Sequence, residues 1–397
     1  MQAAPLKRRI GLGLLTAYGV GVMVGAGIYV LTGAVAAEAG RAAPLAFLLA
    51  GLIAAPTALS YAEFSTRLPE AAGEAAYVGQ GLSSPALALL VGLAIVAAGT
   101  VSAGAVLRGG VGYLAAILDV NTSAAAVALG LALVAVAVLG VLESLALAAV
   151  FTAVEILGLV LVVHAGATAP ELPAEAGAAP AIALAGIGAG AVLAFFAFIG
   201  FEDIVNMAEE VTRPERTLPL AILLALAVTT AIYAAVAWAA TRAVPVDRLA
   251  ETGRPLALVW QARHGGEGDF LSAIAVFAAL NGVLAQIVMA SRVLYGLGAR
   301  SAALSVFHRA HPRFGTPVLA TCLVGGAVIA GALALEVAVL AEATSALLLG
   351  VFALVNLALV RVKRRAPAAA FRVPMAVPVA GAALSLAALA ATLGGIA

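Results

Sequence analysis

Charged side chains are scarce in this sequence. Lysine, arginine, aspartate and glutamate make up 10% of its 397 residues, whereas ordinary soluble domains carry roughly 25%. Hydrophobic residues make up 64% of the chain, and the mean hydropathy is +1.14. This composition excludes an ordinary soluble domain and predicts a protein with many membrane-spanning helices.

Disulfide frameworks, metal motifs and nucleotide-binding motifs are also missing. The single cysteine, Cys322, cannot form a disulfide within the chain or a cysteine metal cluster. The sequence has no His-x-x-Glu-His pattern and no Gly-x-x-x-x-Gly-Lys-Ser/Thr segment. The longest polar connections, Thr168–Ile182 and Ala243–Asp269, are too short for an independent core. We therefore expect no metal centre, no cofactor and no ATPase domain.

Long apolar runs fill most of the chain. A helix that crosses the hydrocarbon core of a membrane needs about 20 such residues. On that requirement the sequence predicts eleven spans, near residues 10–37, 43–66, 82–117, 123–142, 145–167, 185–211, 217–241, 269–299, 316–335, 338–360 and 374–396. The predicted fold class is an all-α polytopic membrane protein, with one transmembrane domain over residues 1–397.

The basic residues are unevenly distributed among the predicted connections. Their number nearly equals that of the acidic residues, giving a net charge of +1 and no basic patch for a nucleic acid. With the N-terminus inside, fourteen of the 21 lie on the inner face: Lys7, Arg8, Arg9, Arg67, Arg213, Arg216, Arg300, Arg309, Arg313, Arg361, Lys363, Arg364, Arg365 and Arg372. Because basic loops stay cytoplasmic, we expect a cytoplasmic N-terminus in the cell membrane and, with eleven spans, an external C-terminus.

Glycine interrupts the first predicted span at Gly25 and Gly27. Lipid offers no partner for a backbone amide or carbonyl that a broken helix leaves free, so a break here must line a cavity. Glycine also lets membrane helices pack closely, and most of the 42 glycines of the chain are expected to have that role. A matching break elsewhere in the chain would favour the cavity.

The sixth predicted span holds such a break. The segment Phe195–Asn206 contains Gly200 and the adjacent acids Glu202 and Asp203. Interrupted helices at matching places in two five-helix halves are typical of inverted-repeat transporters, which bind substrate where the broken ends meet. The predicted parts are a first repeat, a second repeat and an extra C-terminal helix, over residues 10–167, 185–360 and 374–396. Half-helix N-termini suit a carboxylate, and freed carbonyls suit an ammonium group, so the pattern predicts a pocket for the main chain of an amino acid.

Several segments resemble amino acid permeases of the amino acid–polyamine–organocation (APC) superfamily. They are Gly11–Tyr29, Phe195–Ala221 with its stretch Ala208-Glu209-Glu210-Val211-Thr212-Arg213-Pro214, Asn281-Gly282 and Ser291–Gly296. The resemblance covers nearly the whole chain and implies an inverted five-plus-five helix core of the LeuT-like kind. Members of the superfamily usually have twelve helices, whereas eleven are predicted here.

The resemblance also implies site residues. The residues that match the unwound first helix, whose amides hold the substrate carboxylate in the family, are Val24, Gly25, Ala26, Gly27 and Ile28. Those that match the break in the sixth helix, whose carbonyls take the substrate amine, are Phe198, Ile199, Gly200 and Phe201, with Glu202 following. An aromatic ring closes the family's site from outside, and either Phe198 or Phe201 fits that gate, although phenylalanine in a membrane span also commonly packs or faces lipid.

Glu155 lies near the middle of the fifth predicted span, far in sequence from any basic residue. An ionisable group at that depth costs roughly 2.5–3.5 kcal/mol on insertion scales, so it is expected to have a function. Similar proteins often carry a lysine here in place of a second sodium ion. We interpret Glu155 as the carboxyl that takes and releases the coupling proton. Two alternatives are a permanently protonated hydrogen-bond partner and an ion pair with Arg292.

Sodium coupling is the alternative to proton coupling. A sodium ion needs oxygen ligands, and Ser291 together with first-helix carbonyls near Val22 could provide them. One hydroxyl group is a small basis for such a site. We therefore expect a proton as the coupling ion.

Each set of charged residues near the breaks allows two interpretations. Glu202 and Asp203 would favour a substrate with a cationic side chain, such as lysine, arginine or ornithine, or a polyamine; alternatively, they belong to a helix cap or an internal polar network. Glu63, Glu209 and Glu210 are expected to pair with basic residues near the inner end of the protein, namely Arg67, Arg213 or Arg216. Such pairs could form an intracellular gate or be solvated charges at helix ends.

These features predict a secondary active transporter that moves an amino acid by alternating access, with proton symport. An exchanger or uniporter of amino acids or polyamines, a sodium symporter and a transporter-like nutrient sensor are the alternatives. A channel would need a continuous polar lining, whereas the polar groups here concentrate at two breaks and one buried acid. An intramembrane enzyme would need a nucleophile with a base, or a metal cluster, and the sequence offers neither.

Overall fold

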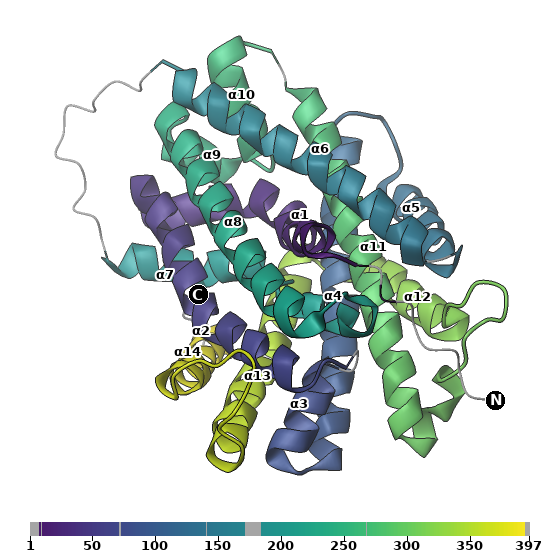
Figure 1. Ribbon diagram of the computed structural model, residues 1–397. Helices are drawn as coiled ribbons and strands as arrows, with labels where there is room; N and C mark the ends of the chain where they lie inside the picture. Colours follow the sequence, from purple (N-terminus) through teal and green to yellow (C-terminus); the bar gives the residue numbers. More distant parts are fainter. Residues whose placement is uncertain are drawn as a thin grey trace.

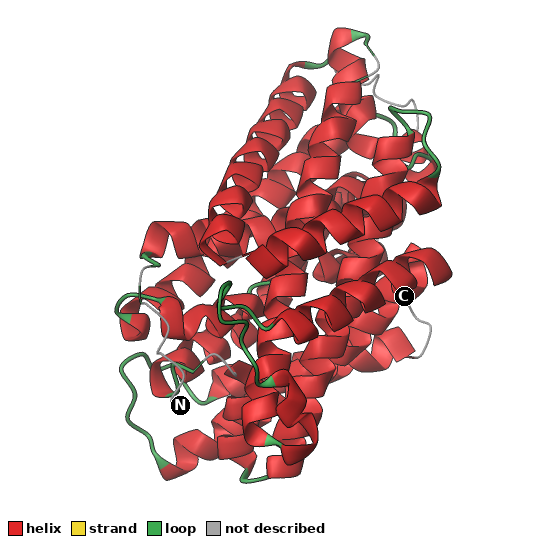
Figure 2. Cartoon of the chain, turned by 90° about the vertical axis from the view of Figure 1, so that its right-hand side faces the viewer, coloured by secondary structure: helices red, strands yellow, loops and turns green. Residues whose placement is uncertain are grey.

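The protein is a bundle of helices (Figure 2), seen here in a computed structural model that describes residues 8, 10–70, 73–139, 141–170, 184–266 and 268–393. The helices of the first half are α1 (Leu12–Ala39), η1 (Gly40–Ala42), α2 (Ala43–Arg67), α3 (Gly73–Leu82), α4 (Pro85–Ala115), α5 (Thr122–Leu139) and α6 (Val141–Thr168). Those of the second half are α7 (Leu184–Phe195), η2 (Phe196–Phe198), η3 (Glu202–Glu210), α8 (Pro214–Ala243), α9 (Val246–Glu251), α10 (Pro255–His264), α11 (Asp269–Arg300), η4 (Ala302–Phe307), α12 (Val318–Ala334), α13 (Val337–Arg365) and α14 (Ala376–Leu393).

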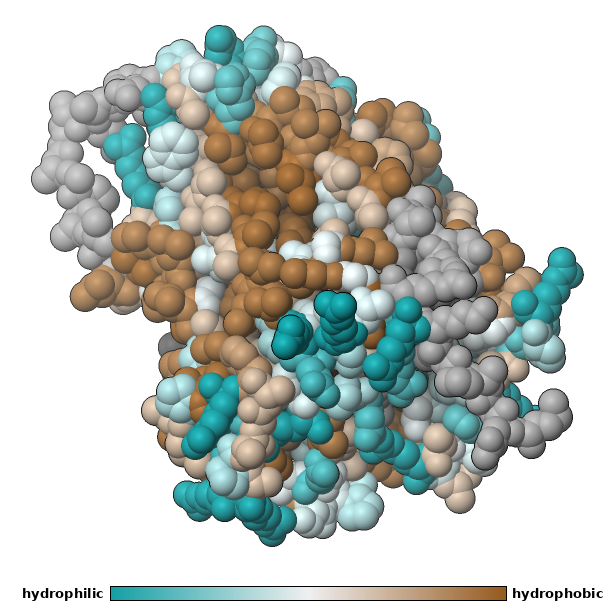
Figure 3. All heavy atoms as spheres, in the orientation of Figure 1, coloured by the Kyte–Doolittle hydropathy of each residue, from teal (hydrophilic) through white to brown (hydrophobic). Residues whose placement is uncertain are grey.

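Ten helical stretches among the described residues are long and apolar enough to cross a membrane. The helix at the predicted ninth span, α12, is apolar but has only 17 residues. The predicted all-α membrane class is thus confirmed, with ten full-length spans and a shorter apolar helix where eleven spans were expected. A broad hydrophobic region covers much of one face, with hydrophilic residues gathered at its top and in its lower half (Figure 3).

Local sequence explains where several helices begin. The Ser84 hydroxyl accepts the N–H of Leu87 at 3.3 Å, and Pro85 occupies the first turn of α4. Serine satisfies an N–H that the first turn leaves free, while proline lacks one of these donors and has the required φ. α8 likewise begins with Pro214, directly after Arg213.

α1 lies at the centre of the bundle. It packs against α6, α7, α8 and α11, and Figure 1 shows it near the middle of the molecule, almost end-on. Around it, α4 packs along α11 and α2 packs along α8. A side chain on α1 is therefore within reach of helices from both halves of the chain.

The start of α1 is also joined to the end of η3. The N–H of Ile10 donates to the carbonyl of Glu210 at 3.0 Å, and the N–H of Thr212 donates to the carbonyl of Ile10 at 2.9 Å. These bonds hold the first residues before α1 beside the segment that leads into α8. The two interrupted segments are thus fastened together at one end.

Candidate functional site

Both predicted interruptions are present as departures from helical geometry. Within α1, Gly25 has φ −2° and ψ −163°, which kinks the helix. In the second half, α7 ends at Phe195, a short 3₁₀ turn follows, and Gly200 has φ +126° before η3 begins. Glycine tolerates these backbone angles because it has no Cβ.

The two breaks pack directly against each other. A methyl group added to Gly200 would lie 2.8 Å from the Val22 side chain and 3.2 Å from the Met23 nitrogen. A methyl group on Gly27 would lie 3.4 Å from Ala197. At Gly200 the approach is this close only because the residue lacks a side chain, whereas at Gly27 a methyl group would make an ordinary contact.

Tyr233 of α8 bridges the two breaks. Its hydroxyl lies 2.5 Å from the carbonyl oxygen of Met23 and 3.0 Å from that of Ala197, within hydrogen-bonding distance of both. Tyr233 is fully buried, and its ring packs edge-on against Phe198 at 5.2 Å. The single hydroxyl hydrogen can be donated to either carbonyl, so one buried tyrosine links the backbone of both breaks.

A small cavity lies where the breaks meet. Its volume is about 30 Å³, and its lining is Val22, Met23, Gly25, Gly27, Ser102, Val106, Phe196, Ala197, Ile199, Gly282 and Gln286. A smaller cavity of about 10 Å³ is lined by Ile95, Ala98, Gly99, Ser102, Ile199, Glu202, Asp203, Gln286, Met289 and Leu348. Three residues, Ser102, Ile199 and Gln286, line both cavities.

These cavities are much smaller than a typical ligand pocket. Binding sites for small molecules usually enclose roughly 300–1,000 Å³, whereas a single water needs only about 10–15 Å³ of such space. Neither cavity, as it stands, could enclose an amino acid.

The predicted residues of the first break divide into lining and core. Gly25 and Gly27 line the cavity, whereas Val24 and Ile28 are fully buried in the hydrophobic core. Ala26 lies within the same helical segment.

The phenylalanines near the second break have different surroundings. Phe196 lines the cavity, while Phe198 packs on Tyr233 and Phe201 packs on Tyr61 and Phe352. Both Phe198 and Phe201 are fully buried. Phe196 is thus the aromatic residue of this segment that faces the cavity.

Glu202 and Asp203 form an internal network and also line the smaller cavity. A carboxylate oxygen of Glu202 accepts the N–H of Gly200 at 2.9 Å, and Asp203 accepts a hydrogen from the Gln286 amide at 2.7 Å. Both acids are at most 2% exposed. The two acids therefore belong to an internal polar network and also lie beside a cavity.

Glu155 is buried between α6 and α11. Its Oε1 accepts the Asn281 amide at 3.0 Å, and the same amide lies 3.2 Å from the hydroxyl of Thr152. Among the described residues, Oε2 has no hydrogen-bond partner. Asn281 adjoins the cavity residue Gly282, so the partner of Glu155 is the immediate chain neighbour of a residue of the cavity wall.

Arg292 is not the partner of Glu155. It pairs with Glu210 at 2.8 Å and donates to the sulfur of Met207 at 3.0 Å. The ion-pair reading of Glu155 is therefore wrong, because Arg292 lies ten residues beyond Gly282 on α11 and serves the end of η3 instead.

Comparison with known proteins decides the family. The family model described as amino acid permease matches residues 10–396, nearly the whole chain. The chain belongs to the amino acid permease family. The resemblance seen in the sequence is confirmed.

Relatives of this permease carry different substrates in their names. It is 30% identical over 331 residues to the chloroplastic cationic amino acid transporter 9 of Arabidopsis thaliana, covering 77% of this chain and 58% of that protein. It is 29% identical over 415 positions to the methylthioribose transporter of Bacillus subtilis, covering 96% of this chain and 87% of that protein. It is 27% identical over 395 positions to the branched-chain amino acid permease BcaP of the same species, covering 91% of this chain and 82% of that protein. The chain spans little more than half the length of the plant relative.

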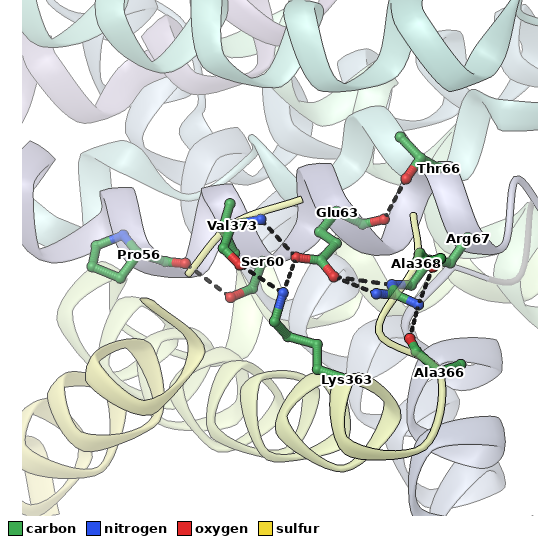
Figure 4. Close-up of polar contacts among 9 residues, drawn as sticks. All are labelled: Pro56, Ser60, Glu63, Thr66, Arg67, Lys363, Ala366, Ala368 and Val373. Atoms are coloured by element: carbon green, nitrogen blue, oxygen red, sulfur yellow. Dashed lines mark hydrogen bonds and ion pairs between the residues drawn. The ribbon is translucent and has the colours of Figure 1, made fainter. Parts of the chain in front are cut away.

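The ion pair expected at the end of α2 is confirmed and is part of a larger cluster (Figure 4). Glu63 is fully buried and accepts from Nη2 of Arg67 at 2.6 Å, from Nζ of Lys363 at 2.6 Å and from the N–H of Val373 at 2.9 Å. Lys363 also donates to the carbonyl of Val373 at 2.6 Å. Glu63 is therefore no solvated charge; it joins the end of α2 to α13 and to the connection that follows it.

Arg67 extends this cluster along the same connection. Its guanidinium donates to the carbonyls of Ala366 at 2.8 Å and Ala368 at 3.1 Å. We name Glu63, Arg67, Lys363 and Val373 the α2–α13 ion cluster. Its role as a gate stays a prediction.

The expected partner of Glu210 is corrected. Glu210 pairs with Arg292 rather than with Arg213 or Arg216, both of which are exposed. Arg213 has φ +50° and precedes the first turn of α8. Glu209 is likewise exposed.

The two residues considered for a sodium site have the following contacts. The Ser291 hydroxyl donates to the Val288 carbonyl at 2.9 Å, and Val22 lines the cavity. Within the described residues, no group of three histidine, cysteine or acidic side chains could hold a metal ion.

Four side chains of this region escaped the sequence analysis: Tyr233, Phe196, Ser102 and Gln286. Tyr233 and Gln286 carried a detectable signal, because a polar group within an apolar span needs a buried partner. Ser102 carried a weaker one, since serine readily bonds within its own helix.

Replacing Gly200 by alanine is expected to reduce substrate affinity at least tenfold. A side chain at φ +126° is strained by roughly 1–3 kcal/mol, and its Cβ would press on Val22 and Met23. Binding measured by calorimetry on the purified protein checks this. Gly326→Ala, at a helical glycine with open space around it, is the matched control and should bind normally. Equal affinities for the two variants would contradict the role given to Gly200.

Proposed function

We propose that this permease transports an amino acid across a membrane by alternating access, with a proton as the coupling ion. One observation carries the proposal: two interrupted helices meet at a buried cavity, and Tyr233 contacts the backbone of both. Broken helices of this kind are tolerated in lipid only where they line a cavity, and transporters bind substrate there.

The two ends of an amino acid fit the two breaks. Backbone amides after Gly25 would hold the carboxylate, because a half-helix begins there. Carbonyls of the turn from Phe196 to Ile199 would take the ammonium group. Phe196, on the cavity wall, would cover the bound substrate, in place of the two phenylalanines first considered for that gate.

The smaller cavity would receive the substrate side chain. Glu202, Asp203 and Gln286 line it, so a cationic side chain would find two acids and an amide oxygen there. A buried acid attracts a cation strongly because the surrounding dielectric is low. The plant relative named as a cationic amino acid transporter agrees with this preference.

The remaining parts follow the same scheme. α1–α6 would form the first repeat and α7–α13 the second, with α14 as the extra helix. The end that carries the α2–α13 ion cluster would face the cytoplasm, because most basic residues lie at that end. The membrane would be the cell membrane.

Uptake into proteoliposomes tests the proposal. A panel of labelled cationic, branched-chain and small amino acids, a polyamine and methylthioribose is offered under an imposed pH gradient, an imposed sodium gradient or neither. We expect saturable uptake of cationic amino acids, raised by the pH gradient and unaffected by sodium. Silence across the panel would contradict transport, and stimulation by sodium alone would contradict proton coupling.

A further inference from the structure

A second group of buried polar side chains lies beside the acids of the substrate site. It comprises Tyr61 of α2, Glu74 and Tyr77 of α3, and Asn206 of η3, each at most 2% exposed. We name these four residues the α3 polar cluster. Among the described residues, none pairs with either tyrosine hydroxyl, with Glu74 Oε1 or with either atom of the Asn206 amide.

The unpaired groups converge on Glu74. The rings of Tyr61 and Tyr77 are 6.1 Å apart, and a methyl group on Gly73 would lie 2.9 Å from the Asn206 amide oxygen. The Asn206 amide and the Tyr61 hydroxyl are near enough to stabilise the charged form of Glu74, although neither completes a hydrogen bond. Several polar atoms thus surround the Glu74 carboxyl, but among the described residues none forms a hydrogen bond with its Oε1.

Such an arrangement is costly, because a buried polar group without a partner has lost its hydrogen bonds to water. Water commonly fills such sites and makes two to four hydrogen bonds there. Burial, together with the charge of Glu202, raises the pKa of Glu74 to about 8. Below this pH the carboxyl is mostly neutral, and above it mostly charged, so it exchanges a proton near physiological pH.

The α3 polar cluster lies between the acids of the smaller cavity and an exposed acid. On one side, Tyr61 lies near Glu202 and Asp203, and Asp203 accepts from Gln286 on the cavity wall. On the other side, burial raises the pKa of Tyr77, and the nearby charges of Glu74 and Glu70 raise it further. Glu70 is 48% exposed.

The charged side chains nearest to Glu74 are mostly acidic. From η3 the acids Glu202 and Asp203 face the cluster, and Glu70 of the connection before α3 pairs with Arg300 of α11 at 2.6 Å. The basic side chains that α13 directs toward α3 reach its other end, where they contact Leu82 and Ser83: they are Arg361 and Arg365. α4, which also packs on α3, carries Arg108 far along its length, bonded to the Ala332 carbonyl.

We propose that the α3 polar cluster holds water and that Glu74 passes protons between the substrate-site acids and the surface at Glu70. A proton moves from the neutral Asp203 carboxyl to the Glu74 carboxylate, which leaves Asp203 charged and Glu74 neutral. Release from Glu74 to surface water restores its charge. This inference rests on the proposed proton-coupled transport and adds to it the route by which the proton reaches the inner side.

Glu74→Gln tests the route in proteoliposomes. The amide has the shape of the neutral carboxyl, so exchange of labelled for unlabelled substrate at equal pH should stay within about twofold of the unaltered protein. Accumulation driven by a pH gradient should fall at least tenfold, and its dependence on internal pH near 8 should disappear. Glu215→Gln, at an exposed carboxyl in the first turn of α8, is the matched control and should behave as the unaltered protein.

Infrared difference spectra give a readout that does not need transport. Between about pH 6 and about pH 10 the unaltered protein should lose a protonated-carboxyl band that Glu74→Gln lacks and Glu155→Gln keeps. Driven accumulation and spectra identical to the unaltered protein would overturn the proposal, and loss of exchange together with driven uptake in folded Glu74→Gln would also overturn it. Absence of uptake by the unaltered protein would instead refute transport itself.

Discussion

Replacing Glu155 by glutamine is expected to abolish proton-driven accumulation while substrate exchange continues. The glutamine carbonyl can still accept from Asn281, because only Oε1 of Glu155 makes that bond. Glutamine, however, cannot take up and release the coupling proton, because it has no titratable carboxyl group. With one proton per substrate, a gradient of about one pH unit supports roughly tenfold accumulation, since one unit corresponds to about 1.4 kcal/mol. The variant should equilibrate without accumulating.

The position of Glu155 explains why it would couple a proton to movement. A methyl group on Gly21 of α1 would collide with Thr152 and lie 3.0 Å from the Asn281 amide, so α1 lies against this cluster just before its break. Gaining or losing a charge there changes the polar contacts of Asn281, which adjoins the cavity wall at Gly282. Opening of α1 and protonation of Glu155 would therefore influence each other.

Glu342→Gln is the matched control for this prediction. Glu342 lies in the long apolar helix α13 but is exposed, so its charge can be lost without effect on the site. Glu155→Asp should keep part of the accumulation, because it keeps a titratable carboxyl. Normal accumulation by Glu155→Gln would leave a permanently protonated structural partner as the explanation of this residue.

The sequence was sufficient for the helices and for the position of the breaks. Spans follow from apolar length alone, and a glycine beside apolar residues is where a membrane helix can depart from regular geometry, as at Gly25 and Gly200. The sequence could not show which polar side chains form hydrogen bonds with each other. Asn281 and Glu155 lie 126 residues apart, and Gln286 and Asp203 lie 83 apart, so only the packing of α11 brings them together.

The phenylalanine choice shows a second limit. η2 is a 3₁₀ turn with about three residues per turn, so residues three apart share a face. Phe196 and Ile199 both line the cavity, whereas Phe198 and Phe201 both face the buried aromatic core. An α-helical register would group the same residues, because residues three apart share a face there too. Neither register tells which of the two groups faces the cavity, so the sequence could not choose among the rings.

Removing the charge of Glu63 is expected to destabilise the protein more than removing any exposed acid. Glu63→Gln leaves the ammonium of Lys363, only 3% exposed, with a carbonyl but no carboxylate. Breaking one partner of a buried ion pair costs about 3–5 kcal/mol, because the other charge stays buried and uncompensated. The apparent melting temperature in detergent should fall clearly below that of the unaltered protein.

Glu70→Gln is the matched control, because it breaks a pair of similar length with different burial. The Glu70–Arg300 distance is 2.6 Å, as is the Glu63–Lys363 distance, but Glu70 and Arg300 are 48% and 42% exposed. An exposed pair contributes about 0.2–1 kcal/mol, so the melting temperature should hardly change. The double variant Glu63→Gln with Lys363→Met should recover much of the loss, since the buried ammonium is gone and the Arg67 guanidinium keeps the carbonyls of Ala366 and Ala368. Equal melting temperatures for Glu63→Gln and Glu70→Gln would mean that water reaches the α2–α13 ion cluster, and the cluster would then be too weak to hold that end of the protein closed.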